Sequence, residues 1–208
     1  MPANAYLLAI LVALIHFATA NFDLYRIHGQ QDTSGSPWGT QPNGYMVFNN
    51  DPTCDDIPDP DQFWWERNDV SGDKISGDKI GVRCKGKSGC GVDEWPWPEI
   101  EEVEMHFCTS PDHHYTIYKD KGRQDGDTWL WPMLRVDNSK AGECFAYGGY
   151  GWDCRWDRRL GKRHQWGQRK FRCITGYEAK DFNDCHHGNI GATNDATASN
   201  STAVVWAA

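Results

Sequence analysis

The chain lacks every short motif that would name a reaction. It has no G-x-S-x-G turn, no glycine-rich phosphate loop and no paired cysteine–histidine signature of a catalytic thiol. The C-x-x-C and H-E-x-x-H spacings of zinc sites are missing, and the aspartates between residues 51 and 61 do not have calcium-loop spacing. We therefore expect no catalytic residue, no cofactor and no required metal, and the sequence disfavours an enzyme.

Long apolar runs are absent beyond the N-terminus. The run at residues 6–15 is too short to cross a membrane, and the small-x-small pattern of a signal-peptidase site follows it at Ala18-Thr19-Ala20. The sequence predicts that residues 1–20 are a signal peptide and that the product is secreted and extracellular, without membrane attachment. Later entry into host cells stays open as an alternative.

Cysteine, in contrast, is plentiful, and every cysteine lies beyond the predicted signal peptide. In an oxidising compartment an even number of thiols forms disulfides, so we expect four bridges and no unpaired thiol. Eight cysteines allow many pairings, and the sequence does not choose among them. They are Cys54, Cys84, Cys90, Cys108, Cys144, Cys154, Cys173 and Cys185.

Long helical periodicity is also missing, which favours a β-rich or α+β fold. Apolar and polar residues alternate at 103–107, as in a strand with one buried face. Pro132 predicts an edge strand or a broken strand around it, and residues 61–70 predict a short helix. The predicted strands are 44–48, 80–84, 103–107, 114–119, 129–136 and 171–175.

The predicted organisation is a single disulfide-stapled domain with short strands and long loops. The disulfide-rich globular domain covers residues 21–187, and residues 188–208 form a flexible tail rich in small and polar residues. Asn200 begins an Asn-Ser-Thr acceptor pattern in this tail and is a glycosylation candidate.

Charge is divided unevenly along the chain. Residues 21–154 hold 24 acidic and 12 basic side chains, whereas residues 155–173 hold eight basic side chains and one acidic. The net charge of −8 argues against a membrane or nucleic-acid partner for the whole molecule. The basic segment predicts a host-partner surface, an anionic-ligand site, a dibasic processing site after Arg163, or an exposed loop. As partner-binding residues we choose Arg155, Trp156, Arg158, Arg159, Lys162, Arg163 and Trp166.

Tryptophan and histidine leave further alternatives open. Neighbouring tryptophans at 64/65, 95/97 and 129/131 are expected mainly in the core, with protein contact and glycan stacking as alternatives. A ribonuclease-type site would use general acid–base groups and an arginine. Its candidate residues are His113 or His114, Tyr115, Tyr118 and Glu104.

The signal pattern at 7–20, the eight later cysteines, the modest length and the missing catalytic signature together resemble the small cysteine-rich secreted effector proteins of fungi. The resemblance extends over the whole chain at the level of class. It implies a virulence effector that binds a host protein, in defence or stress signalling, to promote infection. The alternatives from other classes are a secreted ribonuclease-type hydrolase and a carbohydrate-binding protein.

Overall fold

The computed structural model describes residues 20–31, 43–57, 63–71, 79–94, 99–108, 113–158 and 161–182. For residues 20, 30, 31, 156–158 and 161–163, the description is of the backbone alone. The described residues form strands almost throughout, with a single turn of helix at 179–182. The β-rich, disulfide-linked fold class is therefore confirmed. The predicted tail at 188–208, with Asn200, lies outside the described residues.

All described strands belong to one antiparallel sheet. They are β1 (Ala20–Gln31), β2 (Asn43–Phe48), β3 (Phe63–Trp65), β4 (Gly81–Gly86), β5 (Ile100–His106), β6 (His114–Tyr118), β7 (Arg123–Asp125), β8 (Thr128–Arg135), β9 (Lys140–Ala146), β10 (Gly151–Arg158) and β11 (Gly161–Thr175).

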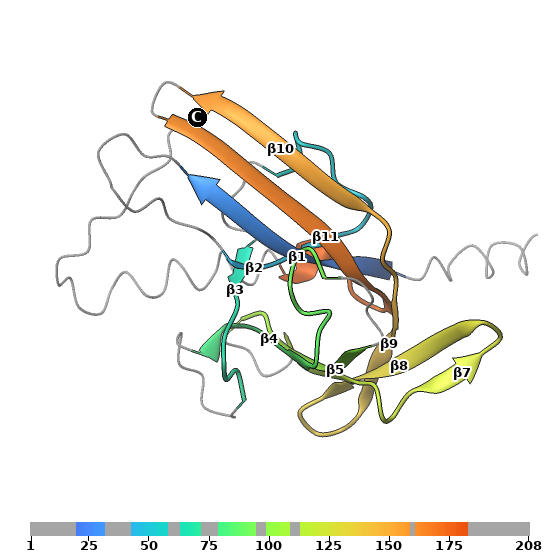
Figure 1. The fold of residues 1–208 in the computed structure, drawn as a ribbon. Coiled ribbons are helices and arrows are strands. Elements are labelled where there is room, and N and C mark those ends of the chain that lie inside the picture. Colours follow the sequence, from blue (N-terminus) through green and yellow to red (C-terminus); the bar gives the residue numbers. More distant parts are fainter. Residues whose placement is uncertain are drawn as a thin grey trace, which may run out of the picture.

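This sheet folds over to make two layers (Figure 1). The hydrogen-bonded order is β3-β2-β1-β11-β9-β8-β6-β5-β4, with β10 beside β11 and β7 beside β8. The long strands β1, β10 and β11 lie in one layer, and β4, β5 and β8 lie beneath them in Figure 1. The two ends of the path meet, because Glu66, directly after β3, bridges Val82 of β4.

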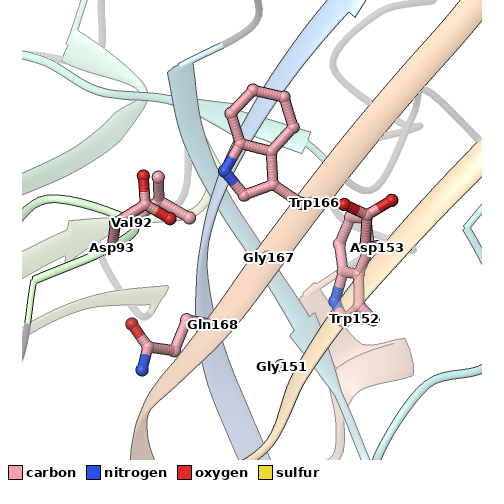
Figure 2. A pocket seen from close by; sticks show the side chains of 8 residues that line it. All are labelled: Val92, Asp93, Gly151, Trp152, Asp153, Trp166, Gly167 and Gln168. Carbon is pink, nitrogen blue, oxygen red and sulfur yellow. The ribbon is translucent and has the colours of Figure 1, made fainter.

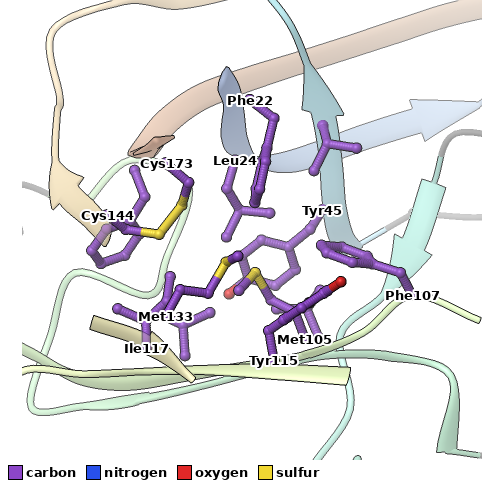
Figure 3. Close-up of a cluster of buried hydrophobic side chains, with 14 of the residues drawn as sticks. Phe22, Leu24, Tyr45, Met105, Phe107, Tyr115, Ile117, Met133, Cys144 and Cys173 are labelled. Carbon is purple, nitrogen blue, oxygen red and sulfur yellow. A yellow bond between two sulfur atoms is a disulfide. The ribbon is translucent and has the colours of Figure 1, made fainter. Parts of the chain in front are cut away.

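The main hydrophobic core fills the space between the layers. Phe22 and Leu24 reach into it from β1, and Met105 and Met133 approach from the opposite layer (Figure 3). All four side chains are completely buried. Full burial of each large apolar side chain contributes about 1.5–3 kcal/mol, so this cluster is the principal source of stability.

Strand β11 contains one extra residue that changes which of its side chains face the core. Tyr25 lies opposite Arg169 and Leu24 lies opposite Phe171, so Lys170 has no partner on β1. A bulge of this kind shifts the alternation of side chains by one position. Even-numbered residues before Lys170 and odd-numbered residues after it therefore share the inner face of the sheet.

The neighbouring edge of β11 changes partner at the same place. β10 pairs with the first half of β11, and β9 pairs with the second half. Residues 147–150 connect β9 to β10 opposite the bulge, where Tyr147 N donates to Lys170 O at 3.1 Å. Gly149 has a φ of 101°, a conformation that favours glycine over residues with a side chain. The bulge and this connection together mark the place where the sheet divides.

A buried ion cluster lies beside the bulge. The completely buried carboxylate of Asp23 accepts from Arg172 Nε at 2.7 Å and Nη2 at 2.6 Å, and from Arg169 Nη1 at 3.1 Å. Arg169 is itself buried; it also contacts Asp51 and donates from Nε to Tyr147 O at 3.0 Å. Each buried charge therefore has a partner of opposite sign, which compensates for the cost of removing it from water.

A second, smaller cluster covers the outer face of β1 and β2. It includes Tyr25 and Ile27 of β1, Met46 of β2, Ile57 and Trp152. Gly167 is required here, since a Cβ at this position would lie 2.6 Å from the Trp152 ring. Residues 49–57 lie against this face through the disulfide from Cys54 to Cys154.

The described cysteines are all paired, as the sequence predicts. The bridges are Cys54–Cys154, Cys84–Cys90 and Cys144–Cys173, and Cys108 is also disulfide-bonded. Cys185 lies outside the described residues. The Cys144–Cys173 bridge joins residues directly opposite each other on β9 and β11.

Two expectations from the sequence are wrong. β8 is neither an edge strand nor broken at Pro132, because it lies between β6 and β9. One edge of β8 pairs with β6 as far as Met133 and with β7 from Leu130. Pro132 lies between these two pairings, so no described strand on that edge needs the N–H that proline lacks. The helix predicted for residues 61–70 is also wrong, since β3 lies there and pairs with β2.

The described residues contain no helix with the length and apolar character needed to span a membrane.

We predict that Asp23→Asn destabilises the fold by about 3 kcal/mol or more, because an amide cannot balance the charges of two arginines. Chemical denaturation at neutral pH measures the change. The matched control is Asp125→Asn, since Asp125 pairs with Arg123 and both side chains are more than half exposed. The control should change stability by less than about 0.5 kcal/mol. Equal effects of the two substitutions would contradict the importance of the buried cluster.

Candidate functional site

The hairpin of β10 and β11 carries the residues predicted to bind a partner. Its pairing runs from Gly151 opposite Gln168 to Arg158 opposite Gly161, close to the turn. The Arg155 side chain is 75% exposed, and the Trp166 side chain is half-buried. The side chains of the other five predicted residues lie outside the description: Trp156, Arg158, Arg159, Lys162 and Arg163.

The C-terminal part of the basic segment has a different role. Arg169 and Lys170 are 5% and 4% exposed, and Arg172 binds the carboxylate of Asp23. These three cations belong to the structure of the bulge. For them, the interpretation of the segment as an exposed loop is wrong, because residues 161–175 form one continuous strand.

A groove of about 400 Å³ lies along the hairpin. Asp153 from β10 and Trp166 and Gln168 from β11 form one side, and Val92 and Asp93 face them from the segment after β4 (Figure 2). Since Gly151 and Gly167 also line the groove, part of its surface carries no side chains. The lining combines the rings of Trp152 and Trp166 with carboxylate and amide groups.

Two imidazoles hold the Trp166 ring in place. The His28 ring on β1 has its centroid 4.5 Å from that of Trp166, and the His164 ring has its centroid at 4.7 Å. His164 Nε2 lies 3.0 Å from Asp153 Oδ1, and His28 Nδ1 contacts the side chain of Asn43. The hydrogen bond from His164 lowers the pKa of the Asp153 carboxyl. Trp166 therefore presents a fixed aromatic surface next to a carboxylate.

The facing wall of the groove is tied to the sheet. The disulfide between Cys84 and Cys90 closes the segment after β4, and Arg26 Nε donates to Cys90 O at 3.0 Å. Lys170 Nζ donates to Glu94 O at 3.1 Å. Burial lowers the pKa of Lys170 to about 8. The residue that forms the bulge thus also anchors this wall.

Sequence reasoning missed most residues of the groove. It selected Trp166 but not Asp93, Asp153 or Gln168, and it did not select the two histidines beside Trp166. A usable signal exists, because residues 164, 166 and 168 share one face of any strand that begins near 161. Predicting 171–175 alone as the strand hid this pattern.

A second polar arrangement lies on the outer face of β4, β5 and β6. His114 Nε2 is 2.9 Å from Glu104 Oε1, and Arg83 donates to Glu104 Oε2 from Nε at 3.0 Å and Nη2 at 2.8 Å. Ser71 Oγ lies 3.1 Å from the same oxygen. The His106 ring stacks on His114 with centroids 4.6 Å apart. We call Ser71, Arg83, Glu104, His106 and His114 the acid–base cluster.

Titration in the acid–base cluster is shifted by burial and by neighbouring charges. Burial raises the pKa of Glu104, but the hydrogen bonds and charges of His114 and Arg83 outweigh it and leave the pKa below its usual value. Burial lowers the pKa of His106, and the charge of His114 adds to that effect. The carboxylate form of Glu104 is thus favoured by its partners.

The structure brings only some of the predicted nuclease residues together. Glu104, His114 and an arginine, Arg83, are in contact as that hypothesis requires. Tyr115 instead lies in the main core on the other face of β6. His113 packs on the rings of Tyr115, Tyr177 and Phe182, away from His114.

The tryptophan pairs divide between core and surface. Trp64 and Trp131 are buried, whereas Trp65 and Trp129 are 51% and 41% exposed. The core role is therefore confirmed for one member of each described pair, and the pair at 95/97 lies outside the described residues. Among the described residues, no group of three or more His, Cys, Asp or Glu side chains is placed to hold a metal ion.

Comparison with known proteins gives no relative. No family model matches the chain, and neither a curated protein nor a solved structure shows significant similarity to it. The groove, the hairpin and the acid–base cluster are therefore the features of the molecule that bear on its function.

We predict that Glu104 makes the free energy of unfolding depend on pH in the acidic range. The pKa of Glu104 is lower in the folded chain than in the unfolded chain. Its contribution to stability is therefore fully present above the unfolded-state pKa and is lost as pH falls through the folded-state pKa. Glu104→Gln should cost about 1–3 kcal/mol near neutral pH and should flatten the acidic limb of the stability profile. Denaturation from pH 7 to pH 3 tests this.

The control for this experiment is Glu101→Gln, on the same strand but exposed. A steep acidic limb in Glu104→Gln, identical to that of the parent protein, would show that Glu104 is not responsible.

Proposed function

We propose that the protein is a secreted effector that binds a host protein through the hairpin of β10 and β11. The observation that carries this proposal is the position of β10, which pairs with β11 alone among the described strands. No described strand pairs with its other edge, and strands at such edges commonly pair with another chain. The ends of β10 and β11 near Arg158 and Gly161 lie away from the lower layer (Figure 1).

Charge supports the same surface. The segment from 155 to 163 holds five basic residues, whereas the chain before it has an excess of acidic residues. Arginine and tryptophan are enriched in binding hot spots, and a basic patch accelerates encounter with an acidic partner. An acidic host protein therefore fits this hairpin better than a basic one.

We predict that replacing Arg158, Arg159, Lys162 and Arg163 with alanine weakens capture of the host partner by at least about tenfold, since several hot-spot cations are lost. Affinity capture from host tissue with mass spectrometry identifies the partner, and titration with the purified partner measures the affinity. Binding by the parent protein should also fall with added salt, because exposed charges are screened over about 8 Å at physiological ionic strength.

A matched pair of variants separates the patch from total charge. Arg158→Ala with Arg159→Ala removes two cations from the hairpin, and Lys85→Ala with Lys87→Ala removes two exposed cations near the end of β4. The hairpin variant should lose affinity and the β4 variant should keep it. Unchanged capture by a folded hairpin variant would overturn the proposal.

A ribonuclease is the second candidate, favoured by one observation: the contacts of Glu104 with His114 and Arg83. A carboxylate and an imidazole can act as general base and acid, and an arginine can stabilise a phosphate. Glu104 and His114 are each 6% exposed. RNA would therefore reach them only after the side chains that bury them move, among them Ser71, which contacts Glu104.

For this candidate, the expected outcome is RNA cleavage by the purified protein that disappears in Glu104→Gln and in His114→Ala. Arg123→Ala, which removes an exposed arginine that pairs with Glu143, serves as the control. Cleavage that persists in both cluster variants would come from a contaminant, and absence of cleavage by the parent protein would remove the candidate.

A further inference from the structure

We propose that the groove beside Trp166 binds an uncharged oligosaccharide, with one sugar ring stacked on the indole. This inference stands apart from the proposed protein contact, because it concerns the inner face of the hairpin and not its edge or its turn.

The aromatic part of the groove suits a sugar ring. Trp166 is half-buried, and the adjacent rings of His28 and His164 fix its orientation. The face of an aromatic ring carries partial negative charge, and the C–H groups on one side of a pyranose carry partial positive charge. A held indole binds such a surface without losing further side-chain entropy.

The polar part of the groove suits hydroxyl groups. The carboxylates of Asp93 and Asp153 accept hydrogen bonds, and the side-chain amide of Gln168 can both donate and accept. Asp93 faces the hairpin from the opposite wall, so a bound ring would have acceptors on two sides (Figure 2). Neutral polyhydroxylated ligands are the class that can satisfy these groups together with the indole.

Charge and size narrow the ligand class. Asp153 contacts Arg155 and His164, whereas the carboxylate of Asp93 on the opposite wall is exposed. The negative charge of Asp93 disfavours phosphate, sulfate or uronate groups in the groove, because like charges repel. The volume of about 400 Å³ lies within the range of ligand sites, about 300–1,000 Å³. The bare backbone at Gly151 leaves one end of the groove without a side chain, so a chain of sugar units can continue beyond the first.

The groove is formed before the ligand arrives. The Cys84–Cys90 disulfide and the hydrogen bonds from Arg26 and Lys170 hold the wall that carries Asp93. The sheet itself holds the wall that carries Trp166. A ligand therefore does not have to order the site, and this lowers the free-energy cost of binding.

The test uses neutral hexasaccharides of chitin, cellulose, laminarin, xylan and mannan, titrated into the full mature protein by calorimetry. At least one should bind, and Trp166→Ala should weaken it by at least about tenfold, because stacking on one aromatic ring contributes much of the binding free energy. Trp65→Ala is the control, since Trp65 is exposed on β3 away from the groove lining. The Trp65→Ala protein should bind the oligosaccharide as tightly as the parent protein does.

A second variant protects the test against misfolding of Trp166→Ala. Asp93→Ala changes an exposed residue of the wall and should also weaken binding, with an unchanged melting temperature. The proposal is overturned if no neutral hexasaccharide binds, if Trp166→Ala and Asp93→Ala bind as well as Trp65→Ala, or if heparin and polygalacturonate bind more tightly than every neutral ligand. Host-protein capture measured on the same variants reports separately on the hairpin.

Discussion

The buried pairing of Asp23 with Arg169 and Arg172 is the constraint from which the rest of the architecture follows. The two arginines flank Lys170, and the single carboxylate on β1 holds both. The bulge is thereby fixed at one position along β11. Because of this position, Trp166 and Gln168 face the same side of the sheet as Phe171 and Cys173. If the bulge lay one residue earlier or later on β11, the groove residues would face outward or Cys173 would be separated from Cys144.

The same bulge explains how much of the fold the sequence could predict. Where alternation is regular, as at Val103, Met105 and Phe107, the strand and its buried face are evident from the residues. In β11 the alternation reverses at Lys170, and only the half after it has a recognisable pattern. The stretch at 61–70 contains no apolar alternation. Residues 63–65 are extended because they pair with β2, and the local sequence does not encode this pairing. Cysteine pairing depends on the same long-range contacts.

The candidate sites show the corresponding limit for function. Glu104 and His114 could be placed together from sequence, since each faces outward on a neighbouring predicted strand. The groove could not, because Asp93, Asp153 and Trp166 come from three segments whose approach depends on the hairpin register and on the tethered wall. Trp166 could be selected from the composition of its segment, whereas its spatial neighbours follow from the topology of the sheet. Likewise, the basic segment is uniform in sequence, but in the structure Arg155 at its start is exposed, whereas Arg169 and Lys170 near its end are buried.

The different exposure of the disulfides has a consequence in a reducing environment. Thiol–disulfide exchange requires a thiolate to reach a sulfur atom. Cys54 is exposed and Cys84 and Cys90 are partly exposed, whereas Cys144 and Cys173 are completely buried. Glutathione would therefore cut the links to residues 49–57 and to the groove wall first, and it would reach the bridge between β9 and β11 last. A molecule carried from the extracellular space into a cytosol would keep its central sheet while its peripheral segments loosened in turn.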